Sequence, residues 1–158
     1  TGPNGHTFDR LEAAHQTGTC GLKSSGELWC WGSLDNSGQI FTASAPERLD
    51  TDNADQPYHL LAAADRNVCM AYGFIGSQDI GCLGFNQSGL VSPELDTNQG
   101  NAFGFTPTHN DVGNVTSLDV HSGTGCFVAG GQTPQISCWG KSADFRTATS
   151  QPTEFFNP

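Results

Sequence analysis

The chain has 158 residues and a mass of 16.7 kDa, which suits a single domain spanning residues 1–158. Sixteen acidic residues against six Lys and Arg give a formal net charge of −10, which argues against a basic nucleic-acid footprint and against electrostatic docking on anionic lipid. Apolar runs such as Leu60–Ala64 are far shorter than the roughly 20 residues of a membrane span, so we expect no membrane insertion. The chain begins at Thr1 without an apolar signal segment, which fits a processed or shortened product.

Six cysteines dominate the sequence pattern, and none lies in the C-x-x-C spacing of zinc or redox sites. They form three pairs with separations of 10, 13 and 12 residues: Cys20 and Cys30, Cys69 and Cys82, and Cys126 and Cys138. The pairs recur roughly every 50 residues, which indicates an internal repeat. Because six cysteines allow 15 connectivities, the pairing has to be argued from geometry.

The first pair predicts an antiparallel hairpin. If Cys20 faces Cys30, then Leu22 faces Leu28, and a three-residue loop ends at Gly26, which can adopt the left-handed conformation. Facing residues have Cα atoms about 4.5–5.5 Å apart, a distance that a disulfide bridges without backbone strain. We therefore expect a disulfide across this hairpin.

The second and third pairs predict hairpins of the same kind. In each hairpin an apolar cross-strand pair lies two residues inside the cysteines: Leu22 with Leu28, Ala71 with Ile80, and Val128 with Ile136. The alternatives are six free thiols in a cytosolic protein, or disulfides that join different repeats. Each local disulfide would contribute somewhat under about 3 kcal/mol. Together they imply an oxidising compartment, meaning secretion or a cell surface.

Three repeats follow from this alignment, at about 8–47, 58–94 and 115–153. Two apolar residues spaced three apart precede each first cysteine: Phe8 and Leu11, Tyr58 and Leu61, and Val115 and Leu118. A large apolar residue and a glycine follow each second cysteine: Trp31-Gly32, Leu83-Gly84 and Trp139-Gly140. Each repeat is therefore predicted to contain three strands followed by a long polar loop.

The strand around Cys30 is apolar on both faces. Alternation places Leu28 and Cys30 on one side and Trp29 and Trp31 on the other. Such a strand belongs to a sheet stacked between neighbours, as in a propeller blade or a sandwich. A single blade cannot bury that area alone, so the repeats must stack.

The segment from Cys20 to Gly32, followed by Asn36-Ser37-Gly38-Gln39, resembles the repeat of the regulator of chromosome condensation β-propeller superfamily. The segment Ile136–Gly140 is similar, whereas the second repeat has Leu83 in place of the tryptophan. The resemblance covers about residues 8–152. It implies an all-β fold with propeller-like blades of four antiparallel strands, and it implies no particular function.

Three blades are fewer than the 4–8 of closed propellers, so we expect an incomplete, open propeller. Its two outer blade faces must be covered by a partner, by further parts of a longer chain, or by tighter packing. We expect these ends to carry apolar residues outside the hairpins: Phe103, Phe105, Phe155 and Phe156.

Two sequons predict N-glycosylation, with Asn86 and Asn114 as acceptors. Residues 147–153 have the composition of an O-glycosylated segment, and a plain polar tail is the alternative. Trp29, Trp31 and Trp139 are candidate sugar-stacking platforms, although their repetition beside the cysteines favours a place in the blade core.

The sequence contains no recognisable catalytic, cofactor or metal motif. The acidic run 50–55 misses the spacing of a calcium loop. The histidines are scattered, and His15 and His121 occupy near-equivalent repeat positions that suit a structural role. No nucleophile elbow, phosphate loop or metalloprotease motif occurs. We therefore expect no enzyme activity, no cofactor and no metal ion.

These observations favour a non-enzymatic, secreted or cell-surface structural protein. It would assemble head to tail with further copies of itself, through its open blade faces, into a filament, coat or ring. The alternative is a recognition module that binds a carbohydrate or another extracellular protein through loops between the blades. A hydrolase without a recognisable motif is a third and weaker hypothesis.

Overall fold

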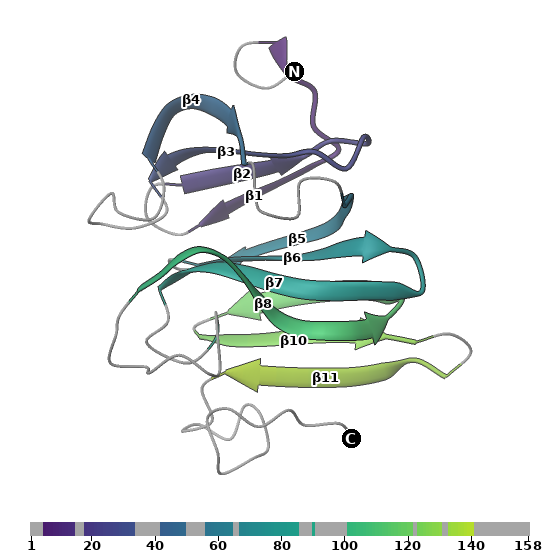
Figure 1. Ribbon diagram of the computed structural model, residues 1–158. Helices are drawn as coiled ribbons and strands as arrows, with labels where there is room; N and C mark the ends of the chain where they lie inside the picture. The colour runs from purple at the N-terminus through teal and green to yellow at the C-terminus, as the bar shows by residue number, and fades with distance from the viewer. Residues whose placement is uncertain are drawn as a thin grey trace.

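The computed structural model describes residues 5–14, 18–33, 42–49, 56–64, 67–85, 90, 101–121, 123–130 and 133–140, with the backbone alone at 14, 42, 85 and 101–107. All described strands belong to three antiparallel sheets (Figure 1). The predicted all-β fold with three propeller-like repeats is therefore confirmed. In the described ranges, no helix has the length and apolar character needed to cross a bilayer.

The first sheet is a four-stranded meander in the order β1-β2-β3-β4. Its strands are β1 (Arg10–Ala14), β2 (Gly18–Leu22), β3 (Leu28–Ser33) and β4 (Thr42–Arg48). Cys20 faces Cys30 and Leu22 faces Leu28, as the hairpin geometry predicts. Gly26 adopts a φ of +82° in the turn, where a side chain would also strike Pro57 of the second repeat.

The second sheet repeats this order, and the third has three described strands in the order β11-β10-β9. The second sheet comprises β5 (Tyr58–Ala64), β6 (Asn67–Phe74), β7 (Ser77–Phe85) and β8 (Asn101–Gly113). The third comprises β9 (Val115–His121), β10 (Thr124–Ala129) and β11 (Gln135–Gly140). Both hairpins have the predicted register, with Ala71 facing Ile80 and Val128 facing Ile136.

A fourth strand lies where the residue pattern of the first two repeats predicts only loop. β4 includes Pro46, and β8 extends the second sheet to Gly113, well past residue 94, where the second repeat was expected to end. Register shifts interrupt the pairing of both strands with their neighbours. Bulges break the two-residue alternation that identifies a strand in a sequence, which explains why the pattern did not indicate them.

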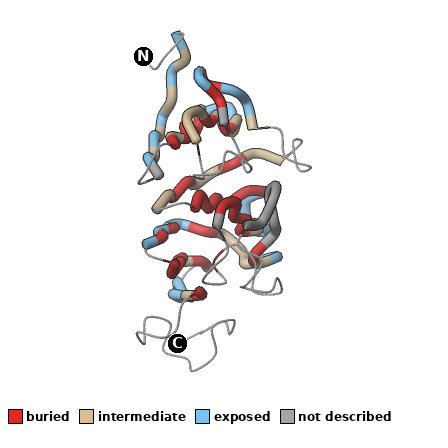
Figure 2. The backbone as a smooth tube through the Cα atoms, turned by 90° about the vertical axis from the view of Figure 1, so that its left-hand side faces the viewer, coloured by how far each residue is buried: buried red, intermediate tan, exposed pale blue. Residues whose placement is uncertain are grey.

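The three sheets are stacked in chain order, with β1 beside β5 and β5 beside β9 (Figure 1). Buried residues occur in the strands of all three sheets (Figure 2). One apolar cluster joins the first sheet to the second, and another joins the second sheet to the third. The middle blade is therefore covered on both faces by its neighbours.

The structure contains three disulfides, one in each repeat, each closing a hairpin with a Cα–Cα distance of 4.1 Å. They join Cys20 to Cys30, Cys69 to Cys82, and Cys126 to Cys138. These are the pairs that the hairpin geometry predicts, and none of the six cysteines is free. The pairs place one cross-link in the two central strands of each repeat.

Candidate functional site

Each contact between blades joins two different kinds of face. The Cys20–Cys30 disulfide lies in the cluster between the first and second sheets, and Cys69–Cys82 lies in the cluster between the second and third. A blade therefore turns its disulfide towards the next blade along the chain.

The residue after the second cysteine points in the opposite direction. Leu83 packs in the cluster shared with the first sheet, and Trp139 packs in the cluster shared with the second. The equivalent residue of the first blade is Trp31, which lies on the face of the first sheet that is turned away from the second sheet. Both covered interfaces thus place the disulfide face of one blade against the Trp or Leu face of the next.

The two end blades consequently present unlike outer faces, at the top and bottom of Figure 1. The N-flank is the outer face of the first sheet, and its central residues are Leu11, Lys23, Trp29 and Trp31. The C-flank is the outer face of the third sheet, and its central residues are Asp119, Cys126, Val128, Ile136 and Cys138.

Equivalent leucines show how far the N-flank is open. Leu61 and Leu118 occupy the same repeat position in the second and third blades and are 0% and 4% exposed. Leu11, at that position in the first blade, is 53% exposed. The side chain is the same in all three blades, so the difference in exposure reflects the missing neighbour.

The C-flank shows the same contrast. Leu28 and Ile80 lie two residues inside their disulfides and are 1% and 0% exposed, whereas Ile136 is 54% exposed. Cys126 and Cys138 are half-buried, while the other four cysteines are fully buried. The C-flank is therefore a disulfide face without the next blade.

The N-terminal segment covers part of the N-flank. The ring of Phe8 stacks on Trp31 with centroids 5.6 Å apart, and the ring of His6 lies 4.4 Å from that of Trp29. Gly21 makes room for this contact, because a Cβ there would lie 2.6 Å from the Phe8 ring. Trp29 and Trp31 remain half-buried, so the coverage is incomplete.

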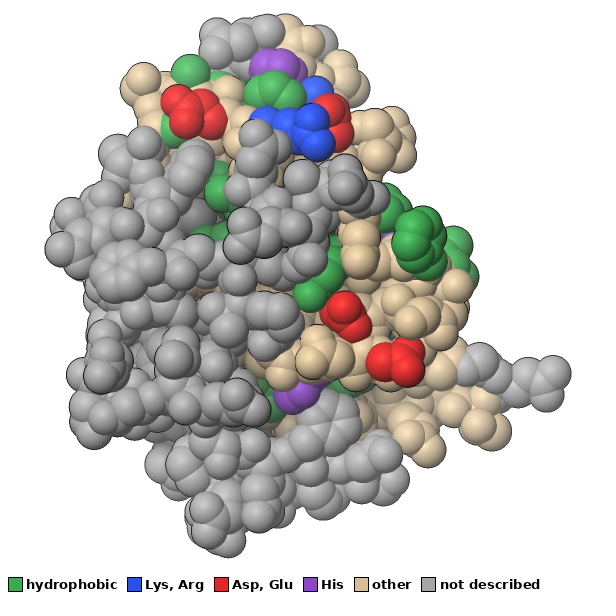
Figure 3. Space-filling view, viewed as in Figure 1, with side chains coloured by type: hydrophobic (Ala, Val, Ile, Leu, Met, Phe, Trp, Pro, Cys, Tyr) green, Lys and Arg blue, Asp and Glu red, His purple; other side chains and the backbone are tan. Residues whose placement is uncertain are grey.

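Two cations and one carboxylate lie together on the N-flank. On the N-flank, the Lys23 ammonium lies 4.1 Å from the centre of the Trp29 ring, and Lys23 and Arg48 both contact the single carboxylate of Glu27. Lys23 lowers the pKa of Glu27 by donating a hydrogen bond to its carboxylate. This group therefore carries one net positive charge. All described Lys and Arg residues belong to the first blade, and the blue side chains in Figure 3 lie over it.

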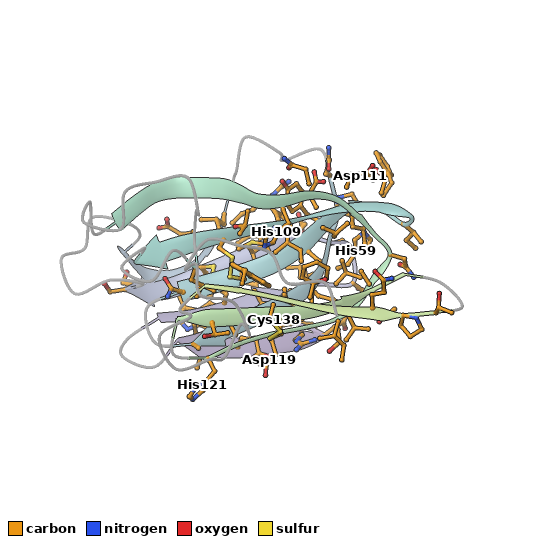
Figure 4. All side chains as sticks on the ribbon, turned by 90° about the horizontal axis from the view of Figure 1, so that it is seen from below. His59, His109, Asp111, Asp119, His121 and Cys138 are labelled. Atoms are coloured by element: carbon orange, nitrogen blue, oxygen red, sulfur yellow. A yellow bond between two sulfur atoms is a disulfide. The ribbon has the colours of Figure 1, made fainter. Side chains whose placement is uncertain are left out.

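The C-flank carries a carboxylate. Asp119 and His121 are exposed on β9 and project outward at the edge of the molecule (Figure 4). Asp119 accepts a 3.0 Å hydrogen bond from the backbone N–H of Val120, which holds its side chain in place. The C-flank thus presents a carboxylate beside its half-buried disulfide.

The interface around Trp139 shows how this face packs when it is covered. Trp139 is 2% exposed, and its indole Nε1 donates a 2.8 Å hydrogen bond to the carbonyl of Leu90. The ring of His109 on β8 meets it edge to face, with centroids 5.0 Å apart. Burial lowers the pKa of His109 to about 4, so this ring is neutral at physiological pH.

The other predicted site residues have different positions. Trp139 is part of the core and presents no platform for a sugar, whereas Trp29 and Trp31 lie on the N-flank. Asn114 is half-buried immediately before β9, and its carbonyl accepts a hydrogen bond from Gly130. Several predictions lie outside the described residues or side chains: His15, 50–55, Asn86, Phe103, Phe105, 147–153, Phe155 and Phe156.

The sequence did not identify the central residues of either flank as interface residues. The available signal was the repeat register, which makes Leu11 equivalent to two core leucines and Ile136 equivalent to two core aliphatic residues. Among the described residues, no group of three or more His, Cys, Asp or Glu side chains could hold a metal ion.

Two solved structures have a similar fold. Human WBSCR16 is similar over 85% of this chain, with a TM-score of 0.64 and 20% sequence identity. Prp20p from Saccharomyces cerevisiae is similar over 86% of this chain, with a TM-score of 0.66 and 17% identity. The chain spans about a third of each, covering 34% and 31% of their lengths. No protein-family profile and no curated protein matches the sequence.

The Prp20p structure was described together with its binding to Gsp1p and histones, which concerns that protein. At 17% and 20% identity the likeness extends to the fold alone. The three blades, the four-stranded meanders of the first two and this likeness agree with the resemblance in the cysteine repeats. The chain therefore shares the propeller-like fold of these two structures, in an open three-bladed form.

Proposed function

We propose that this protein is a non-enzymatic structural module that associates head to tail, with the C-flank of one copy packed against the N-flank of the next. The contrast at equivalent positions carries the proposal, because Leu11 and Ile136 are half-exposed where their counterparts are at most 4% exposed. Contact between the flanks would bury both side chains in the kind of interface that already joins the first sheet to the second and the second sheet to the third. Repetition of this contact produces a ring if the rotation closes, and a filament or coat if it does not.

The type of contact also supports this arrangement. Both covered interfaces pair a disulfide face with a Trp or Leu face, and the N-flank and C-flank are one face of each type. Two N-flanks would bring like charges together around Lys23, whereas an N-flank and a C-flank bring that cation towards Asp119. Contact between the N-flank of one copy and the C-flank of another is therefore better matched than contact between two N-flanks or two C-flanks.

An extracellular location is part of the proposal. Three disulfides in a 158-residue chain suit an oxidising compartment. The half-buried Cys126–Cys138 bridge on the C-flank would face reductant in the cytosol, whereas outside the cell it would persist. Glycans on Asn86 and Asn114 would be consistent with the same location.

Sedimentation over a range of concentrations tests the assembly. We expect wild-type protein to increase in mass with concentration, and Leu11→Asp and Ile136→Asp each to weaken association at least 100-fold, because each buries an unpaired carboxylate in the new contact. Ile75→Asp is the matched control, since Ile75 is 78% exposed on the β6–β7 turn, away from both flanks.

Mixing the two flank variants provides a sharper result. Leu11→Asp retains an intact C-flank and Ile136→Asp retains an intact N-flank, so an equimolar mixture should form a heterodimer and nothing larger. A wild-type protein that stays monomeric at millimolar concentration contradicts the proposal. So does an Ile75→Asp variant that loses association to the same extent as the flank variants.

A further inference from the structure

A polar groove lies where the end of β8 meets the β10–β11 hairpin, at the boundary between the second and third blades. Its volume is about 340 Å³, near the lower end of the range for small-ligand sites, about 300–1,000 Å³. The residues that matter for its chemistry are Asn110, Asp111, Phe127, Thr133, Gln135 and Ser137. In Figure 4, Asp111 lies at the opposite edge of the molecule from Asp119 and His121, so the groove is separate from the C-flank.

Asp111 at the rim has an unusual backbone conformation. Its φ is +51°, and it is the one non-glycine residue with a positive φ among the described residues. Its backbone N–H donates a 2.6 Å hydrogen bond to Asp79 Oδ1, and its own Oδ1 accepts a 3.0 Å bond from the hydroxyl of Ser77. Strained residues held in this way occur preferentially at binding sites. Aspartate tolerates a positive φ better than most side chains, and these two hydrogen bonds hold Asp111 in this conformation.

The lining determines which ligands the groove accepts. Two amides, two hydroxyls and a carboxylate offer both donors and acceptors, and Ser137 among them is only 4% exposed. Phe127, at 3% exposure, forms part of an apolar floor. Among the described residues that line the groove there is no Lys, Arg or His, so an anionic ligand would meet the Asp111 carboxylate without a compensating cation.

We propose that this groove binds a neutral, hydroxyl-rich ligand, namely a monosaccharide unit of a glycan. The Asp111 carboxylate would accept hydrogen bonds from adjacent hydroxyls, while the amides of Asn110 and Gln135 would donate to ring or hydroxyl oxygens. The site is independent of the three tryptophans and of the association between flanks, so either proposal can fail without the other.

Titration with methyl glycosides tests the site directly. The probes are the methyl glycosides of glucose, galactose, mannose and N-acetylglucosamine, with methyl glucuronide as the anionic comparison. The protein is prepared without glycans, because the Asn114 sequon lies close to Gly130 of the groove. In ¹H–¹⁵N spectra we expect at least one neutral glycoside to shift the side-chain amides of Asn110 and Gln135, and methyl glucuronide to bind at least 10-fold more weakly.

Two substitutions at the rim separate binding from structure. Asp111→Gly removes the carboxylate and relieves the positive φ but also loses the hydrogen bond from Ser77, so the melting temperature should change little while glycoside binding weakens at least 10-fold. Asp111→Asn retains the size of the side chain and tolerates a positive φ, and it should also weaken binding through the lost charge. Asp119→Asn, at the opposite edge, is the matched control and should bind as the wild type does.

Three results would overturn the proposal. They are the absence of binding by every neutral glycoside, equal binding of methyl glucuronide, and unchanged binding by both Asp111 variants. A residue that acts only in folding would change the melting temperature in Asp111→Gly and leave the glycoside affinity unchanged.

Discussion

The middle blade and the two end blades are built from the same repeat, yet side chains at equivalent positions are buried to different extents in them. In the middle blade both faces are apolar and covered, and Leu61 and Ile80 are fully buried. In the end blades the same two positions are half-exposed, at Leu11 on the N-flank and Ile136 on the C-flank. Burial in a stacked-repeat protein is therefore a property of the neighbour as much as of the residue.

Truncating the equivalent leucines is the strongest test of this comparison. Leu61→Ala removes a fully buried side chain between two blades and should lower the free energy of unfolding by about 2–5 kcal/mol. Leu11→Ala should change it by less than about 0.5 kcal/mol in the monomer, because its side chain already contacts water. Urea denaturation at low protein concentration measures both. Equal losses would show that the N-flank is as well covered as the core.

Acid should weaken the covered interface between the second and third blades. The folded pKa of His109 is about 4 and its ordinary value is 6.5, so between these values the unfolded chain binds a proton that the folded chain does not. The stability is therefore complete above pH 6.5, falls as the pH decreases towards 4, and levels off below that. The loss from this residue is about 3 kcal/mol.

Urea denaturation between pH 7.5 and 4 tests this dependence in the wild type and in His109→Gln. The free energy of unfolding of the variant should fall much less over this pH range than that of the wild type, because the variant has no imidazole to protonate. His121→Gln, on the exposed C-flank, is the matched control and should retain the wild-type profile. A wild-type profile in His109→Gln would contradict the assignment.

Substitutions of the tryptophans after the second cysteine should show the smallest difference in stability between a covered and an open position. Trp139→Phe loses the indole hydrogen bond to Leu90 in a buried interface, which should destabilise the protein by about 1–3 kcal/mol through the unpaired carbonyl and the smaller ring. Trp31→Phe, on the half-buried N-flank, should change the free energy of unfolding by less than about 1 kcal/mol. Thermal unfolding distinguishes the two variants, and a larger loss of stability in Trp31→Phe than in Trp139→Phe would contradict the comparison.

Local pattern predicted the hairpins and their disulfides well. The register of each hairpin follows from the position of its cysteines and its turn, and the same register pairs Leu22 with Leu28 and Val128 with Ile136. The outer strands β4 and β8 were not apparent in the residues, because bulges interrupt their alternation and long segments separate them from their partners. The four-stranded blade came from the resemblance instead.

The candidate sites were less accessible to sequence reasoning. The tryptophans have equivalent repeat positions but different surroundings, since Trp139 is buried beneath a neighbouring blade and Trp31 is half-covered by Phe8. The polar groove joins β8 to a hairpin from the next repeat, and nothing in the local pattern marks Asp111 as strained. Sites formed by residues from two repeats depend on how the blades stack.

Local sequence pattern was enough to predict the register of the three hairpins, their disulfides and the two-faced character of the strand around Cys30, because each follows from contacts between residues close together in the chain. The stacking of the blades sets which of the three equivalent leucines is open to water and which neighbour each disulfide faces, and the sequence pattern did not show either. Burial depends on the presence of an adjacent blade, and contacts within one repeat do not specify that neighbour.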